Sequence, residues 1–251
     1  MTRLKEHCGV FGIFENKDSA ALTALGTESF EISVTLTLTV IPLFVLMGNL
    51  AGVSGMSRDL FNAAYSWVGH WRGGLASATI AGCAGFAALS GSSIASAVTM
   101  GRVALPEMKR FKYGDSLATG AVAAGGTLGI LIPPSIMLVI MADLLSISVG
   151  TLFLAAVIPG LLLAFIYTIY IYLRTKFNPK LAPALSDDVG PKTKMELWVM
   201  VFRSFLPPIF LIMCVLGSIF AGVATPTEAA AVGALGSIIL ALFNRRLTKT
   251  V

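Results

Sequence analysis

The chain has 251 residues, of which 56% are hydrophobic and only 12% are charged, and its mean hydropathy is +0.84. Soluble domains carry about 25% charged residues, so this composition excludes an ordinary soluble protein and indicates an all-α integral membrane protein. The net charge of +5 comes from basic residues in short loops between apolar runs, where they set the orientation of a membrane protein. We therefore expect a lipid bilayer around the chain and no nucleic-acid partner.

The first 27 residues form a polar head, whose charges interrupt its one hydrophobic patch. A signal peptide needs an apolar core of about 7 to 15 residues, so we do not expect the head to be one. We treat residues 1–27 as a separate segment that does not form a folded domain.

Four uncharged runs follow, and each is long enough to cross a membrane, since a transmembrane helix needs about 20 apolar residues. Thr225 and Glu228 match a capping box with Pro226 at the first helical position, which predicts the start of a further apolar helix. The four long runs and the shorter final run lie at residues 32–53, 116–142, 144–173, 204–227 and 229–244.

Two polar segments separate these runs. Residues 54–72 include Trp67, His70 and Trp71, a mixture typical of an interfacial helix with aromatic anchors, so we expect this segment to lie on the membrane surface. Residues 174–203 contain several prolines and glycine, so we expect an irregular cytoplasmic linker.

Two uncharged segments are interrupted by small and polar residues. Residues 73–101 contain SGSS at positions 90–93, which is too polar for an ordinary span. The segment can be a re-entrant helical hairpin or a single crossing, and both satisfy the positive-inside rule. The polar tip favours the hairpin, because a lipid-facing break would leave backbone groups unpaired. Residues 116–142 predict a broken transmembrane helix, interrupted between Gly125 and Ser135.

Unwound backbone at membrane depth exposes carbonyl oxygens that can bind ions. We expect the two interruptions to face each other, with the hydroxyls of Ser90, Ser92 and Thr127 as ligands of a sodium ion. These runs contain no acidic or basic side chain that could carry a proton, which favours sodium as the coupling ion and no other cofactor. The expected ion- and substrate-binding residues are Asn49, Ser90, Gly91, Ser92, Ser93, Thr127, Gly129, Pro133, Pro134 and Ser135.

Each feature also has a purely structural explanation. Small residues near the tip are common in close helix packing, and Pro133-Pro134 can mark a simple kink. Asn49 can make a packing hydrogen bond, and the capping role is favoured for Glu228.

Taken in chain order, these stretches resemble one known family. From about residue 28 to residue 247 the chain resembles the dicarboxylate-type large membrane subunit of the tripartite ATP-independent periplasmic (TRAP) transporters. The matching stretches are IPLF at 41–44 with Gly48-Asn49, SGSS at 90–93, TLG at 127–129 with IPPS at 132–135, and TPTEAAA at 225–231.

The resemblance implies an elevator-type, sodium-driven secondary transporter of inverted repeats, with several passes through the bacterial inner membrane. It also implies a small membrane subunit, a periplasmic binding protein and an organic-acid substrate such as a C4-dicarboxylate or sialic acid. The family's large subunit is longer, so we expect a first repeat at residues 28–173, the linker, and the start of a second repeat at residues 204–251.

The head resembles a different protein. Residues 8–14, CGVFGIF, resemble the N-terminus of amidophosphoribosyltransferase, in which a short propeptide is removed to expose a cysteine nucleophile, here Cys8. A thiol without its substrate pocket and oxyanion hole does not catalyse. We therefore expect a transporter component and not an enzyme. A glutamine amidotransferase fragment, a channel and a non-transporting membrane remnant are the alternatives.

Overall fold

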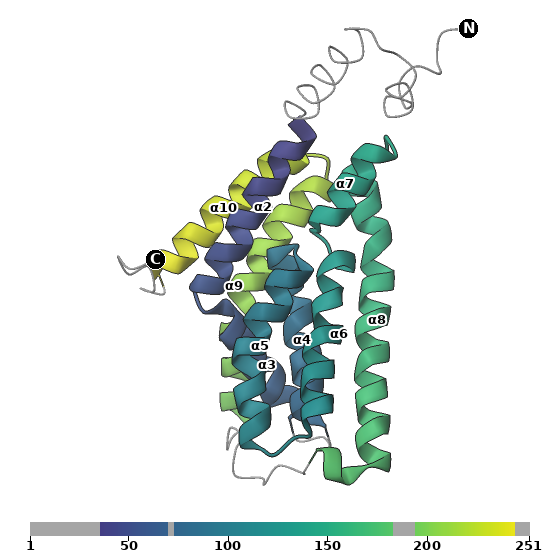
Figure 1. The fold of residues 1–251 in the computed structure, drawn as a ribbon. Coiled ribbons are helices and arrows are strands. Elements are labelled where there is room, and N and C mark those ends of the chain that lie inside the picture. The colour runs from purple at the N-terminus through teal and green to yellow at the C-terminus, as the bar shows by residue number, and fades with distance from the viewer. Residues whose placement is uncertain (1–35, 70–72, 183–193, 244–251) are drawn as a thin grey trace, which may run out of the picture.

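The computed structural model describes residues 36–69, 73–182 and 194–243, and within these ranges it contains helices and no β-strand. The predicted all-α class is confirmed for this part of the chain (Figure 1). The head and Cys8 lie outside the described residues. The elements are α2 (Leu36–Val53), α3 (Met56–Val68), α4 (Gly74–Ser90), α5 (Ser93–Arg110), α6 (Asp115–Leu131), α7 (Ile136–Leu144), α8 (Val149–Phe177), the short 3-10 helix η2 (Pro179–Leu181), α9 (Lys194–Phe220) and α10 (Pro226–Phe243).

The length and composition of the helices suit a membrane. Among the described residues, α8 is the one single helix long and apolar enough to cross a membrane, and the bent pairs α2–α3 and α6–α7 also qualify when each pair counts as one span. The pairs bend by 64° and 40° at their breaks. Large apolar side chains on α8 point outward, including Ile158 and Phe165, which are 75% and 62% exposed. An outward apolar face of this kind is suited to lipid.

Helix α4 lies at the centre of the described bundle, where it packs against α3, α5, α6 and α8 (Figure 1). Fourteen of its 17 residues are buried. A helix that is apolar on all sides is stable when protein or lipid surrounds it, and around α4 it is protein. At its start, the Leu75 amide donates a 3.4 Å hydrogen bond to the Tyr113 hydroxyl in the loop after α5.

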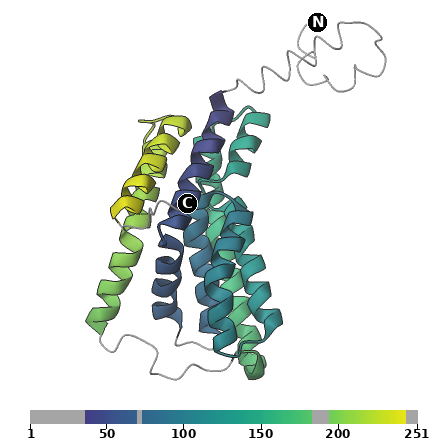
Figure 2. The ribbon, with the colours of Figure 1, turned by 60° about the vertical axis from the view of Figure 1, so that its left-hand side comes forward.

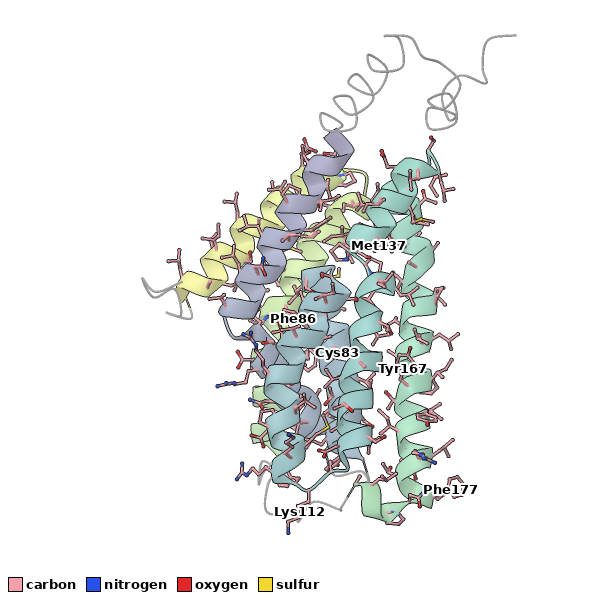
Figure 3. The ribbon with its side chains drawn as sticks, viewed as in Figure 1. Cys83, Phe86, Lys112, Met137, Tyr167 and Phe177 are labelled. Atoms are coloured by element: carbon pink, nitrogen blue, oxygen red, sulfur yellow. The ribbon has the colours of Figure 1, made fainter. Side chains whose placement is uncertain are left out.

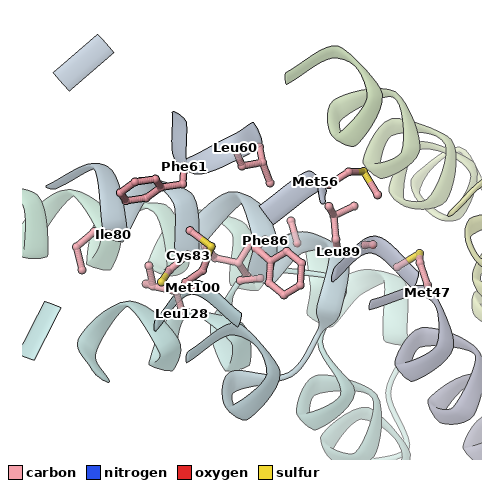
Figure 4. Packing of buried hydrophobic residues seen from close by; sticks show 14 of the residues in the cluster. Met47, Met56, Leu60, Phe61, Ile80, Cys83, Phe86, Leu89, Met100 and Leu128 are labelled. Atoms are coloured by element: carbon pink, nitrogen blue, oxygen red, sulfur yellow. The ribbon is translucent and has the colours of Figure 1, made fainter. Parts of the chain in front are cut away.

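The core around α4 combines large side chains with close backbone approaches. Phe86 is 1% exposed and packs within a cluster that includes Leu60 of α3 and Leu128 of α6 (Figure 4). A Cβ atom on Gly125 of α6 would lie 2.7 Å from the Cys83 sulfur, so a larger residue there would push α6 away from α4. Glycine in α6 therefore allows the two helices to pack closely.

Helices α9 and α10 stand to one side of the other helices (Figure 2). Helix α10 packs against α2 and α9, and α9 also packs against α3. The predicted capping box is confirmed: the Thr225 amide donates to the Glu228 carboxylate at 2.8 Å, and the Glu228 amide donates to the Thr225 hydroxyl at 3.3 Å.

Residues 54–72, which we expect on the membrane surface, include α3, and the apolar face of α3 is covered by protein. Leu60, Phe61 and Ala64 are at most 2% exposed, and the helix packs against α4, α5 and α9. An amphipathic helix can bury its apolar face in protein as readily as in a lipid interface, and its sequence pattern is the same in both cases. Trp67 does remain 63% exposed, whereas residues 70–72 lie outside the described residues.

The expected irregular linker at residues 174–203 is shorter than predicted. Helix α8 continues to Phe177, η2 follows, and α9 already begins at Lys194. The prolines that suggested an irregular segment lie in η2 and in residues 183–193, which are outside the described residues.

The central core predicts a large difference between two phenylalanines. We expect Phe86→Ala to lower the free energy of unfolding by about 3 to 5 kcal/mol, because it leaves a cavity beside α4. Phe177 is 78% exposed, so Phe177→Ala should change stability by no more than about 0.5 kcal/mol. Denaturant titration in detergent micelles, followed by circular dichroism, measures both. Equal losses would contradict the central position of α4.

Candidate functional site

The first interruption is a turn of two residues between α4 and α5. Gly91 has a φ angle of +58°, and its amide still donates to the Ala87 carbonyl at 2.9 Å, which ends α4. Glycine adopts this left-handed conformation without the clash that a Cβ atom would cause. Ser92 is the N-cap of α5, and its hydroxyl accepts a 3.4 Å hydrogen bond from the Ala95 amide. Helices α4 and α5 then pack against each other along their length.

The second interruption is shorter than predicted. The chain stays helical through Gly125 and Gly129 as far as Leu131, so the expected break at these glycines is wrong. A glycine within a helix costs only about 1 kcal/mol, whereas a proline removes an amide donor and clashes with the preceding turn. The helix accordingly stops just before Pro133 and Pro134, whose peptide bond is cis, and α7 begins after Ser135.

The two interruptions are in direct contact. The Ile136 amide, at the start of α7, donates a 3.2 Å hydrogen bond to the Gly91 carbonyl. A Cβ atom on Gly91 would lie 2.8 Å from the Pro134 carbonyl oxygen. The expected meeting of the two breaks therefore occurs through the backbone, between residues 91 and 134–136.

Two further glycines allow other helices to approach this junction closely. A Cβ atom on Gly129 of α6 would lie 2.8 Å from the Ser92 carbonyl carbon and the Ser93 amide nitrogen. A Cβ atom on Gly48 of α2 would lie 2.6 Å from the Ser90 Cα. Helices α2 and α6 can therefore reach the tip of the α4–α5 pair because both lack a side chain at the point of contact.

The hydroxyl groups at the junction differ in their partners. The Ser90 hydroxyl is 2.8 Å from the Ser96 hydroxyl, and both residues are at most 1% exposed. Ser96 was not predicted, although it lies one helical turn after Ser92 and so on the same face of α5. The Ser135 hydroxyl oxygen is fully buried and, among the described residues, has no hydrogen-bond partner.

A buried polar atom without a partner usually costs about 1 to 3 kcal/mol, so the Ser135 oxygen is available to bind a water molecule or an ion. It lies in the break between α6 and α7. Pro133 and Pro134 have no amide hydrogen, so they cannot donate to the carbonyls four residues earlier, those of Gly129 and Ile130. Hydroxyl and carbonyl oxygens suit a hard cation. The described residues contain no cluster of His, Cys, Asp or Glu that could hold a transition metal.

Two predicted residues lie away from the junction. The Thr127 hydroxyl donates to the Ala124 carbonyl at 2.7 Å and is 3.2 Å from the Tyr167 hydroxyl of α8, so it faces α8 and not Ser90 and Ser92. Tyr167 is labelled on α8 in Figure 3. Asn49 is exposed and lines a separate cavity between α2, α3 and α5. The predicted set of Ser90, Ser92 and Thr127 is therefore not brought together.

Alanine at two glycines of α6 should have opposite effects. We expect Gly129→Ala to lower the free energy of unfolding by about 1 to 3 kcal/mol, because its Cβ would overlap the tip backbone. A Cβ atom on Gly120 would meet nothing within 4 Å, so Gly120→Ala should stabilise the helix by about 0.5 to 1 kcal/mol. Thermal unfolding in detergent measures the two variants side by side. A Gly129→Ala protein as stable as Gly120→Ala would rule out the close contact.

Comparison with known proteins assigns the chain to a family. The family model described as "Tripartite ATP-independent periplasmic transporter, DctM component" matches residues 8–250. The C4-dicarboxylate TRAP transporter large permease protein DctM of Pseudomonas aeruginosa is 42% identical over 226 residues, covering 90% of this chain and 51% of that protein. The sialic acid TRAP transporter large permease protein SiaM of Vibrio cholerae is 38% identical, covering 81% of this chain and 46% of that protein. The ectoine/5-hydroxyectoine large permease UehC of Ruegeria pomeroyi is 32% identical, covering 80% and 45%.

The match begins at residue 8, so it includes most of the head, and the comparisons do not support the amidophosphoribosyltransferase resemblance. The chain spans about half the length of the curated relatives it matches. Those relatives are named as transporter permeases and not as enzymes. On this evidence the chain is an integral membrane protein that belongs to the DctM family of TRAP transporter large permeases.

Proposed function

We propose that the chain is a membrane subunit of a sodium-coupled TRAP transporter that imports organic acids. The observation that carries the proposal is the backbone contact between the two helix breaks, beside the unpartnered Ser135 hydroxyl. Broken helices in a membrane transporter are suited to binding ions and substrates, because their free carbonyls and helix ends face protein and not lipid.

The sodium site that we propose lies at the junction and differs from the one expected from the sequence. Ser135 supplies a buried hydroxyl oxygen, and the break before it supplies carbonyl oxygens. Ser90 and Ser92 lie next to this point, since the tip contacts residues 134–136. In the proposed ligand set Ser135 takes the place of Thr127, because the Thr127 hydroxyl already contacts the Ala124 carbonyl and the Tyr167 hydroxyl. Sodium would bind at this site together with the substrate, and the sodium gradient across the membrane would drive uptake.

We further propose that α4 and α5 form a re-entrant hairpin whose tip lies inside the membrane. The turn at Gly91 and Ser92 connects α4 to α5 with only two residues. Helix α5 packs against α4 and α6, so protein surrounds the hairpin. Such a hairpin can move as one body with α6 and α7, as in an elevator-type transporter of inverted repeats. We place the protein in the bacterial inner membrane, with a cytoplasmic segment between α8 and α9.

The partners and substrate are proposed from the family. The relatives are named for C4-dicarboxylate, sialic acid and ectoine, so we propose an organic acid of this range as substrate. A periplasmic binding protein would deliver it, and a small membrane subunit would complete the transporter. Uptake of radiolabelled succinate into proteoliposomes, with both partners present, should require an inward sodium gradient. Uptake that continues without sodium and does not saturate would indicate a channel.

The Ser135 hydroxyl provides a direct test of the sodium site. We expect Ser135→Ala to be as stable as the native protein or about 1 to 3 kcal/mol more stable without sodium, since it removes a buried unpartnered group. Sodium at 100 times its dissociation constant should stabilise the native protein by about 2.7 kcal/mol, and this gain should be lost in Ser135→Ala. Thermal unfolding in potassium and in sodium chloride at equal ionic strength measures both effects.

Two variants serve as controls for that test. Ser218→Ala removes a hydroxyl that donates to the Val215 carbonyl within α9, so it should keep the full response to sodium. Thr127→Ala distinguishes the two proposed ligand sets, and we expect it to keep the response as well. Loss of the response in Thr127→Ala but not in Ser135→Ala would return the site to the set expected from the sequence.

A further inference from the structure

The polar cavity that Asn49 lines lies beside the tip of the α4–α5 pair. It has a volume of about 420 Å³ and lies between α2, α3 and α5. Gly48 lines it and also abuts Ser90, and Ala95 in the first turn of α5 lines it too. The cavity therefore borders the junction but draws its polar groups from other residues.

Five polar side chains line this cavity, one of which is the buried Ser57 at the start of α3. Asn49 comes from α2, Arg58 from the first turn of α3, and Thr99 and Arg102 from one side of α5. Residues 99 and 102 are three apart on a helix, so their side chains point in similar directions. Two positive charges from separate helices thus converge on one cavity that contains no acidic side chain.

The two arginines are not neutralised by ion pairs with the described residues. The one ion pair among these residues joins Arg110 to Glu107 at 3.7 Å. Glu107 follows Arg102 on α5 by five residues, and Asp59 follows Arg58 directly, yet neither lies within 4.0 Å of a cavity arginine. Unpaired guanidinium groups at a cavity are suited to bind an anion, because each offers a planar set of donors that matches a carboxylate.

We propose that this cavity binds a carboxylate group of a small organic anion, held by Arg58 and Arg102 and oriented by Asn49 and Thr99. Cavities that bind small molecules are usually about 300 to 1,000 Å³, so this volume accommodates an acid of four carbons or more. The proposal rests on the proposed function in one respect: it takes the anion to be the transported organic acid. It assigns substrate recognition to residues outside the two helix breaks.

The test is binding of carboxylates to the full chain in nanodiscs made of phosphatidylcholine. The probes are succinate and N-acetylneuraminate, with uncharged succinamide as the matched control ligand, and isothermal titration calorimetry measures each dissociation constant. We expect at least one acid to bind and succinamide not to bind. Arg102→Gln and Arg58→Gln should each weaken acid binding by about tenfold or more, as for loss of a charge-assisted hydrogen bond.

A variant of equal charge change controls for the general electrostatic field. Lys176 is exposed at the end of α8 and does not line the cavity, so Lys176→Gln should leave the dissociation constant unchanged. Arg102→Lys keeps the charge but loses the planar pair of donors, so its affinity should fall between those of the native protein and Arg102→Gln.

Three results would overturn the proposal. They are failure of both acids to bind, affinity that both glutamine variants retain, and an equal loss in Lys176→Gln. Anionic phospholipid that copurifies with the native protein and is lost in both variants, without acid binding, would assign the arginines to lipid headgroups instead. The stabilisation by sodium, measured in the same samples, separates this outcome from failure of the proposed function: it should persist in Arg58→Gln and Arg102→Gln.

Discussion

One main-chain hydrogen bond, from the Ile136 amide to the Gly91 carbonyl, joins two of the places where helices break inside the described bundle. Each break exposes amide and carbonyl groups that a membrane interior cannot solvate. The bond satisfies one orphan amide at the start of α7 with one free carbonyl at the end of α4. The arrangement of the surrounding helices follows from bringing these two backbone segments together.

That approach is possible because the contacts have almost no side-chain volume. Gly48, Gly91 and Gly129 each face backbone atoms at distances that exclude a Cβ atom. The large side chains lie farther along α4, where Phe86 and its neighbours fill the core. Small residues at the junction thus allow the helices to approach closely, whereas the bulky residues farther along α4 stabilise the bundle by hydrophobic burial.

The sequence correctly predicted those turns and helix ends that are determined by neighbouring residues. The turn at Gly91 and Ser92, the stop at Pro133-Pro134 and the capping box at Thr225 each depend on residues within four positions of one another. The predicted break at Gly125 to Gly129 was wrong, because glycine permits a break but does not require one when a neighbour such as Cys83 packs against it. For α3 the sequence pattern does not reveal whether protein or lipid covers its apolar face, and the structure shows protein there.

The site residues show the same division between local and distant causes. Ser135 was predicted as a binding residue from its place after two prolines, but its lack of a partner depends on three-dimensional packing. Arg58 and Arg102 belong to the basic residues that the sequence analysis assigned to loops. Their shared cavity was not predicted, because 44 positions separate them and nothing in the sequence brings them together. Asn49 was predicted, and the structure places it with these arginines and not at the junction.

The junction bond joins main-chain atoms, and the contacts around it need positions without a side chain, such as Gly91 and Gly129. The polar cavity, in contrast, is lined by side chains, and each can change without breaking the contact between Gly91 and Ile136. During evolution, selection could therefore alter the cavity lining while leaving the junction intact. Substitutions in the cavity lining and substitutions at the junction are therefore expected to act independently of each other.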